Sequence, residues 1–118
     1  MARAATTADA FNAVAEPRRR LILDELAAGE RSVSELVERL ELAQPLVSKH
    51  LRVLREVGAV AVREDGRQRL YSVDARALKP IHDWVSRYER MWSERFEALE
   101  TVLDELKREE RDDADDDA

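Results

Sequence analysis

The stretch that decides the fold is SVSELVERLELAQPLVSKHLRVLREVG, residues Ser32–Gly58. Ser32 and Glu35 have the spacing of a capping box, in which each side chain accepts a hydrogen bond from a free backbone N–H group at a helix start. A helix should therefore begin at Val33. Its apolar side chains recur every three or four residues, which places on one face Val33, Leu36, Val37 and Leu40. The next residues, Glu41–Ala43, should form a tight turn.

A second helix with two different faces should follow this turn. A rotation of about 100° per residue places on the core side Val47, Leu51, Leu54 and Gly58. The opposite side is polar, short and basic, and carries Pro45, Ser48, Lys49 and Arg52. Gly58 suits the left-handed residue that ends many helices. The pair has the pattern of a helix-turn-helix, whose second helix fits a DNA major groove. The alternative is an ordinary amphipathic pair with a solvated basic face.

Length and composition exclude several classes of protein. The chain has 118 residues, 44% of them hydrophobic, which suits one domain with one core. We expect a cytoplasmic location, because no apolar run approaches the length of a membrane span and residues 1–10 lack a signal-peptide block. The absence of cysteine excludes disulfides and thiolate metal sites. An enzyme is not expected, since no carboxylate pair, nucleophile–base set or glycine-rich phosphate loop is present.

The charge is unevenly distributed. The net charge is −6, which argues against a nucleic-acid partner at first sight. Residues 44–73, however, carry six basic and three acidic side chains, a net charge of +3, which leaves −9 for the remainder. Positive charge is thus concentrated on the second helix of the pair and the segment after it, where a nucleic acid would bind.

Two helices should precede the helix-turn-helix. The first is predicted over Ala8–Ala15, after a loose terminus, with an apolar face of Phe11, Val14 and Ala15. The second is predicted over Pro17–Ala28, because proline is favoured at the first helical position, and its buried face comprises Ile22, Leu23 and Leu26. The run Arg18–Arg20 is most simply a solvated cluster, and a contact with DNA phosphate is a minority alternative.

A basic β-hairpin is predicted after Gly58. Asp65-Gly66 is a strong hairpin signal between two strands, Val60–Glu64 and Arg67–Val73. Pairing about that turn places Val60 opposite Tyr71 and Val62 opposite Arg69, with arginines near the tip. An exposed edge hairpin protected by charge is one interpretation. Because the hairpin directly follows a helix-turn-helix, we expect a wing that reaches the DNA backbone or minor groove.

A long helix should complete the fold. Asp74–Lys79 has room for one helical turn, and Pro80 then opens a periodic segment that reaches about Glu110, roughly 45 Å of helix. Its apolar residues recur every three or four positions and form one stripe: Ile81, Val85, Tyr88, Trp92, Phe96, Leu99, Leu103 and Leu106, widened by Trp84, Met91 and Val102. So wide an apolar stripe on so long a helix requires a partner, for which a second copy of the chain is the simplest choice. The alternative, a helix folded back over its own domain, would cover only the first half of this apolar stripe. The acidic residues 111–118 are expected to be disordered.

The predicted fold class is mostly α with a small β-hairpin, a winged helix-turn-helix in the order α-α-α-α-β-β-α with a long C-terminal dimerisation helix. Residues 1–79 would form the DNA-binding part with its N-terminal helix, and residues 80–110 the dimerisation helix of the same domain.

This order resembles the ArsR-like winged helix-turn-helix transcriptional repressors of bacteria, closely over Phe11–Val73. The combination of SKHLRVLREVG with the later DGRQRLY carries most of the resemblance. It implies that the recognition helix and the wing face DNA and that the first and last helices pair two subunits. The DNA-binding residues expected are Gln44, Pro45, Leu46, Ser48, Lys49, Arg52, Arg63, Arg67 and Arg69. The dimer-interface residues expected are Phe11, Val14, Trp84, Tyr88, Trp92, Phe96, Leu99, Leu103 and Leu106.

Three positions depart from the family pattern. Glu41 stands where the turn usually has glycine, and Ala43 stands where a hydroxyl cap is common. Without that cap, N–H groups at the start of the recognition helix are expected to be free to bind a phosphate. Leu46 replaces a small hydroxyl residue, which favours contact with a thymine methyl group.

No metal site or cofactor is expected. Metal-sensing members of the family use cysteine clusters or His/Asp sets on the last helix, whereas this helix offers only His82 and Asp83, adjacent residues that point in different directions. His50 is expected to be a packed histidine. The function expected is a dimeric repressor that binds an inverted repeat in double-stranded DNA. The alternative is a protein–protein interaction module without DNA binding, and the sequence identifies no small-molecule effector.

Overall fold

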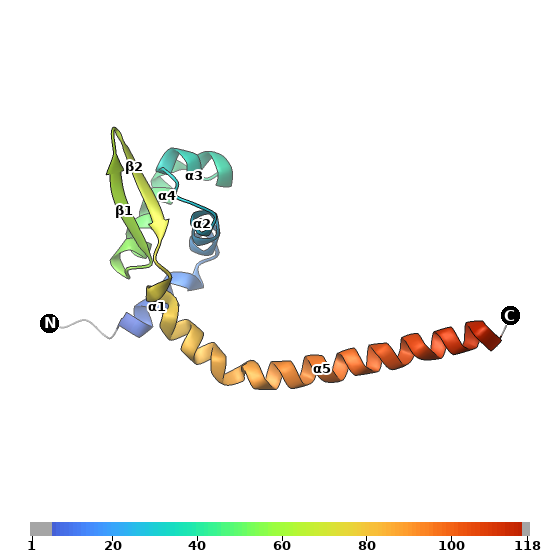
Figure 1. Cartoon of the computed structure of the whole chain (residues 1–118). Coiled ribbons are helices and arrows are strands. Elements are labelled where there is room, and N and C mark those ends of the chain that lie inside the picture. The colour runs from blue at the N-terminus through green and yellow to red at the C-terminus, as the bar shows by residue number, and fades with distance from the viewer. Residues whose placement is uncertain (1–5, 117–118) are drawn as a thin grey trace. The chain divides into compact units, whose positions relative to one another are not determined.

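The computed structural model describes residues 6–116, with side chains described for residues 10–114. The elements in chain order are α1 (Thr6–Ala15), α2 (Pro17–Ala27), α3 (Val33–Leu40), α4 (Gln44–Glu56), β1 (Val60–Asp65), β2 (Gln68–Val73), the 3-10 turn η1 (Ala75–Leu78) and α5 (Lys79–Asp116) (Figure 1). This mostly helical order with one hairpin confirms the predicted fold class. The chain divides into two compact units between His82 and Asp83.

The helix-turn-helix begins with the predicted capping box. The Ser32 hydroxyl accepts from the N–H of Glu35 at 3.2 Å, and the Glu35 carboxylate accepts from the N–H of Ser32 at 3.1 Å. Glu41 then adopts a left-handed conformation, with φ 55° and ψ 42°, so the turn accommodates a side chain where glycine would be unstrained. This backbone conformation turns the chain from α3 into α4.

The end of α4 is fixed by a Schellman motif, as the position of Gly58 predicted. The N–H of Gly58 donates to the carbonyl oxygen of Arg55 at 3.0 Å, and the N–H of Ala59 donates to that of Leu54 at 2.9 Å. Gly58 has φ 82°, and Ala59 and Leu54 are both fully buried. The motif therefore turns the chain directly from α4 into β1.

One core holds the first unit together. It combines side chains from α2, α3, α4 and the hairpin, and its most buried members are Ile22, Leu36, Val47, Leu51 and Leu54. The predicted apolar face of α1 is wrong in part, because Ala10 and Ala13 are buried while Phe11 and Val14 are half-buried and Ala15 is exposed. Alanine has little apolar surface, so the periodicity of larger side chains pointed to the wrong face.

The hairpin is present, but its predicted register is wrong by two residues. Val60 pairs with Val73, Val62 with Tyr71, and Glu64 with Arg69. Gly66, with φ 63°, is the first of the two loop residues, and only that position needs positive φ in a type II′ turn. Since a shift of two residues keeps every side chain on its face, the apolar base and basic tip are unchanged.

The segment before α3 also joins the hairpin, which the sequence did not indicate. The N–H of Arg31 donates to the carbonyl oxygen of Tyr71 at 3.1 Å, and the N–H of Tyr71 donates to that of Arg31 at 2.8 Å. This bridge ties the wing to the start of the helix-turn-helix.

The last helix is longer than predicted. After the helical turn expected at Asp74–Lys79, α5 runs from Lys79 to Asp116 instead of ending near Glu110. The predicted disorder at 111–118 is therefore wrong for residues 111–116, and residues 117–118 lie outside those described. Neither proline nor glycine occurs in residues 107–116, so no helix-breaking residue ends α5 near Glu110.

Candidate nucleic-acid interface

The outer face of α4 carries the predicted recognition residues. Gln44, Pro45, Lys49 and Arg52 are exposed, and Leu46 and Ser48 are half-buried. The opposite face packs into the core through Val47, Leu51 and Leu54. The core therefore fixes how the helix is rotated, and its polar face is left accessible for a ligand.

The start of α4 offers fewer free N–H groups than the sequence suggested. Ala43 supplies no side-chain cap, as predicted. However, the N–H groups of Leu46 and Val47 both donate to the carbonyl oxygen of Ala43 at 3.1 Å, and Pro45 has no N–H. Within the described residues only the N–H of Gln44 lacks a backbone acceptor in this turn, so an anion site built on the helix start alone is poorly supported.

The predicted basic residues of the wing differ in their partners. Arg67 at the tip and Arg69 on β2 are exposed, and within residues 10–114 neither has a hydrogen bond or an ion pair. Arg63 on β1 instead binds both carboxylate oxygens of Glu30, each at 2.8 Å. These hydrogen bonds lower the pKa of the Glu30 carboxyl, which is thus held ionised against Arg63. The charge of Arg63 is therefore largely neutralised in the free chain.

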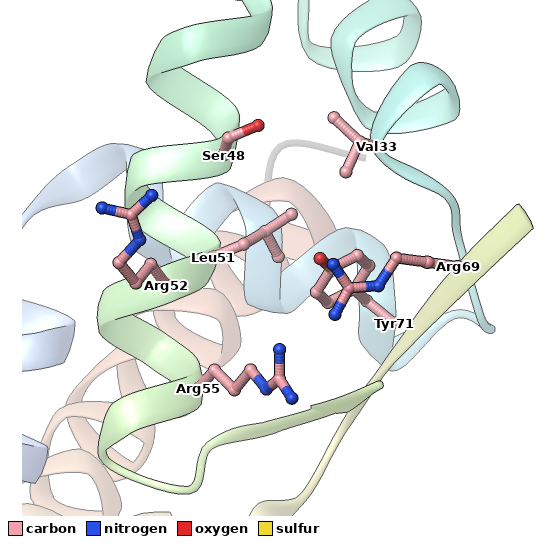
Figure 2. A pocket seen from close by; sticks show the side chains of 7 residues that line it. All are labelled: Val33, Ser48, Leu51, Arg52, Arg55, Arg69 and Tyr71. Carbon is pink, nitrogen blue, oxygen red and sulfur yellow. The ribbon is translucent and has the colours of Figure 1, made fainter. Parts of the chain in front are cut away.

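A pocket of about 280 Å³ lies between α4 and β2, and seven residues from α3, α4 and β2 line it (Figure 2). Arg55 extends from α4 and Arg69 from β2 into the space between the two elements, whereas the guanidinium group of Arg52 lies on the other side of α4 in this view. Sequence analysis did not assign Arg55, although its spacing from Ser48 and Arg52 places all three on one stripe of α4.

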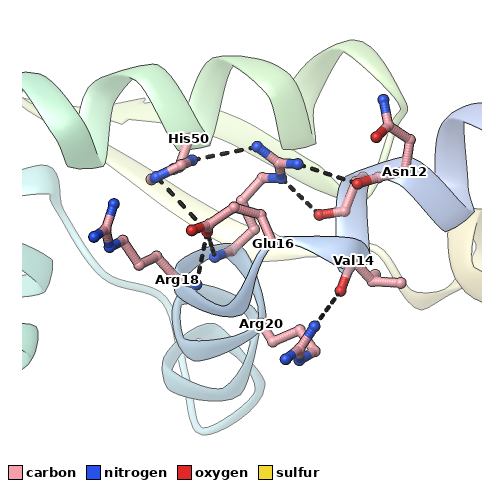
Figure 3. Close-up of polar contacts among 8 residues, drawn as sticks. Asn12, Val14, Glu16, Arg18, Arg20 and His50 are labelled. Carbon is pink, nitrogen blue, oxygen red and sulfur yellow. Dashed lines mark hydrogen bonds and ion pairs between the residues drawn. The ribbon is translucent and has the colours of Figure 1, made fainter.

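A polar cluster joins α1, α2 and α4 (Figure 3). The Glu16 carboxylate caps α2 by accepting from the N–H groups of Arg18 and Arg19, at 2.7 and 3.1 Å. The Arg19 guanidinium donates to the carbonyl oxygen of Ala13 at 2.6 Å, and that of Arg20 donates to the carbonyl oxygen of Val14 at 2.6 Å. The solvated cluster predicted for Arg18–Arg20 is therefore wrong for Arg19, which is half-buried, whereas Arg18 and Arg20 are exposed. Arg19 and Arg20 both satisfy carbonyl groups at the end of α1.

His50 connects α4 to this cluster. It is 5% exposed, which confirms the predicted packed histidine, and its Nδ1 lies 3.4 Å from Nη1 of Arg19. Its Nε2 lies 3.8 Å from the Glu16 carboxylate. Burial lowers the pKa of His50, so the fold favours the neutral imidazole. The helix α4 is thus anchored to α1 and α2 by a polar contact as well as by the core.

The second unit carries a long apolar stripe. Its large side chains are between 41% and 64% exposed, and they include Trp84, Tyr88, Trp92, Phe96, Leu99, Leu103 and Leu106. Trp84 and Tyr88 contact each other edge to face, with ring centroids 5.6 Å apart. The other two expected interface residues, Phe11 and Val14, are half-buried on α1. An apolar surface of this length on one helix is unusual unless it binds a partner.

The described residues hold neither a metal-binding cluster nor a membrane-spanning helix. No group of three or more histidine, aspartate or glutamate side chains lies close enough together to hold a metal ion. Nor is any helix in the described part of the chain both long and apolar enough to cross a membrane.

Taken together, a capped helix-turn-helix, a hairpin bonded to its start and exposed basic side chains on both define a winged helix-turn-helix protein of the DNA-binding class. Comparison with known families agrees, since residues 16–62 match the model of the arsR family of bacterial regulatory proteins. The HTH-type transcriptional regulator Rv2034 of Mycobacterium tuberculosis is 32% identical over 95 residues, which cover 80% of this chain and 86% of that protein. The chain therefore belongs to the ArsR family of DNA-binding transcriptional regulators, a family without enzymatic activity.

Further relatives and solved structures are similar to parts of the chain. A probable mercury resistance operon repressor of Streptomyces lividans is 44% identical over 68 residues, 58% of this chain and 54% of that protein. Among solved structures, a possible transcriptional regulator for arsenical resistance has a TM-score of 0.62 at 32% identity and covers 73% of this chain and 95% of its own. The homodimeric winged helix-turn-helix domain of Mb0332 from Mycobacterium bovis has a TM-score of 0.60 at 28% identity, covering 73% and 82%.

Proposed function

We propose that the chain acts as a homodimeric repressor that binds an inverted-repeat operator, with α4 in the major groove and the wing on the backbone or in the minor groove. The observation that carries this proposal is the set of unpaired cations on α4 and the wing. Within residues 10–114, no hydrogen bond or ion pair neutralises Lys49, Arg52, Arg67 or Arg69. In the same unit Arg39, Arg63 and Arg76 are each bound to a carboxylate.

The dimensions of α4 support a major-groove position. Its 13 residues make a helix of roughly 20 Å, short enough to lie within the groove. Lys49 and Arg52 project from the side opposite the core, so the Lys49 ammonium group and the Arg52 guanidinium group have access to base edges. Arg67 at the hairpin tip is suited to the neighbouring backbone, where a charge contributes affinity without sequence preference.

The apolar stripe of α5 supports a homodimer. Two copies of the chain would bury on each other the side chains that are about half exposed in one copy. A homodimeric relative of known structure adds to this argument. A two-fold dimer presents two recognition helices, which is why the operator should be an inverted repeat.

The small number of side chains that could bind a metal ion supports regulation that does not depend on a bound metal. The chain has no cysteine and only two histidines, His50 and His82. Both ring nitrogens of His50 face charged neighbours in a buried cluster, which leaves that residue badly placed as a ligand. No small-molecule effector is proposed.

The proposal is tested by selecting bound sites from random duplexes with the full chain. The expected product is an inverted repeat with half-site centres about 10–11 base pairs apart, or a multiple of that spacing, because two equivalent helices must enter the groove on one side of the DNA. Recovery of no enriched sequence would contradict the proposal and favour a protein–protein interaction module instead.

A further inference from the structure

We propose that the pocket between α4 and β2 binds one phosphodiester group of the DNA backbone, held between Arg55 and Arg69. This inference rests on the proposed DNA-binding function and adds to it a defined contact. It assigns a role to Arg55, which lies outside the residues expected from the family resemblance. It also separates Arg69 from Arg67, since the two wing arginines would contact different parts of the DNA.

The shape of the pocket supports an oxyanion ligand. Its volume is about 280 Å³, and its apolar wall includes Leu51 and Tyr71, which are 2% and 8% exposed. Arg55 approaches from the helix and Arg69 from the strand, so two planar guanidinium groups reach the same space from different elements (Figure 2). Guanidinium groups match the geometry of phosphate oxygens and bind them through two parallel hydrogen bonds.

Within the described residues, no ion pair neutralises the two arginines that extend into the pocket. Arg55 and Arg69 have no hydrogen bond or ion pair to a carboxylate in the part of the chain that the structure describes, although Glu64 lies opposite Arg69 in the hairpin. Cations that share one small space repel each other, and an anion between them removes that repulsion while gaining charge-assisted hydrogen bonds. By contrast, Glu30 neutralises Arg63 on β1, whereas no carboxylate within residues 10–114 forms an ion pair with Arg55 or Arg69.

The position of the pocket favours a DNA phosphate over a free anion. Sites for small molecules usually enclose most of their ligand, whereas Arg55 and Arg69 are both exposed. Ser48 and Arg52 belong both to the pocket and to the proposed DNA-binding face, so the two surfaces are continuous. A sugar–phosphate strand that passes between the recognition helix and the wing would cross this opening.

The first experiment compares three variants of the full chain, Arg55→Gln, Arg69→Gln and Arg76→Gln, by fluorescence anisotropy on the selected site and a scrambled duplex. Arg76 is the control, because its loss changes the charge equally but removes a cation already bound to Asp74. The first two variants should each bind both duplexes about tenfold more weakly, and the double variant should lower the salt slope by about one. The control should bind as the wild type does.

A second experiment locates the phosphate. A single neutral methylphosphonate is moved along each strand of the selected site. In each half-site, one position should weaken wild-type binding about tenfold and leave the double variant Arg55→Gln/Arg69→Gln unaffected, because that variant has already lost the contact. Thermal melting establishes that each variant is folded. Should Arg69→Gln destabilise the hairpin, Arg55→Gln on the exposed side of α4 carries the same test.

Several results would overturn the inference while leaving the proposed function intact. Variants that bind both duplexes as the wild type does would overturn it, as would variants that lose affinity for the selected site alone, which would indicate base contacts. In a separate arm, inorganic phosphate is titrated into the DNA-free protein at constant ionic strength. Phosphate binding that requires both arginines, together with unchanged DNA affinity, would identify a free-anion site. A wild-type chain that binds neither duplex would contradict the proposed function itself.

Discussion

The arginines of the first unit differ in what their guanidinium groups contact, and this difference assigns them different roles. Arg19 and Arg20 bind carbonyl groups at the end of α1, and Arg63 binds Glu30. Those three contribute to the structure. Arg52 and Arg67 are exposed and unpaired within the described residues, so their side chains are available to a ligand.

We predict that Arg52→Ala and Arg67→Ala weaken DNA binding in different ways. Loss of a base contact by Arg52→Ala should cost about 1–3 kcal/mol on the selected site and little on a scrambled duplex. Loss of a phosphate contact by Arg67→Ala should weaken both duplexes alike and reduce the salt slope by about one. Titrations of each variant at several salt concentrations measure both effects. Equal affinity of both variants and the wild type on the selected site would contradict these assignments.

Glu41 offers a test of local backbone strain. Its φ of 55° is unfavourable for any residue with a Cβ atom, so Glu41→Gly should raise the free energy of unfolding by about 0.5–1 kcal/mol. The control is Glu38→Gly, an exposed position within α3, where glycine should lower it by about 1 kcal/mol. Urea unfolding at one protein concentration gives both values. A Glu41→Gly chain no more stable than the wild type would show that the turn stores no strain.

Local signals at the residue scale were predictable, and long-range contacts were not. The Ser32–Glu35 capping box and the Gly58 helix end follow from short sequence patterns, and both are confirmed. The Arg63–Glu30 pair and the contact of Arg19 with His50 join residues more than thirty positions apart. No short sequence pattern identifies Glu30 as the partner of Arg63 among the 26 acidic residues of the chain. Such long-range contacts can therefore be identified only from the folded structure.

At the scale of elements, periodicity and turn signals located the helices and strands that the structure describes, but they did not fix all their faces or ends. The buried faces of α2, α3 and α4 match the predicted apolar stripes, because each has several large side chains at helical spacing. In α1 the buried side chains are alanines, which carry a weak signal. The hairpin register depends on which residue takes the first loop position, and one glycine is compatible with two choices.

The apolar stripe on α5 is predicted to join two subunits. If these side chains join two subunits, Leu99→Lys places a charge in an apolar seam and should cost several kcal/mol, enough to dissociate a dimer at micromolar concentration. Thr101→Lys is the control, because it adds the same charge on the opposite side of the helix. Light scattering distinguishes monomer from dimer. A Leu99→Lys chain that stays dimeric at that concentration would place the interface elsewhere.

For the whole molecule, distribution of charge matters more than its sum. The chain carries a net charge of −6, yet the segment that includes α4 and the hairpin carries a net charge of +3. An acidic remainder discourages nonspecific contact with DNA, while the basic segment retains local affinity. The sequence alone permitted this argument, but it did not show which cations remain unpaired.

Metal independence is a prediction about the whole chain. The absence of cysteine and the buried position of one of only two histidines lead us to expect that Zn²⁺ or a chelator leaves operator affinity unchanged. Anisotropy titrations with and without each reagent measure this, with a control for nonspecific precipitation. A reproducible change of tenfold or more would show that a metal regulates binding.

The central claim is that this chain recognises a particular DNA sequence as a dimer. It is tested most directly by titrating the wild-type chain against the selected inverted repeat and a scrambled duplex of the same composition, at one fixed salt concentration, with the stoichiometry determined in the same experiment. We predict two chains per duplex and an affinity for the inverted repeat at least about a thousandfold higher than for the scrambled duplex. Equal affinity for the two duplexes would contradict sequence-specific repression and support an interaction module.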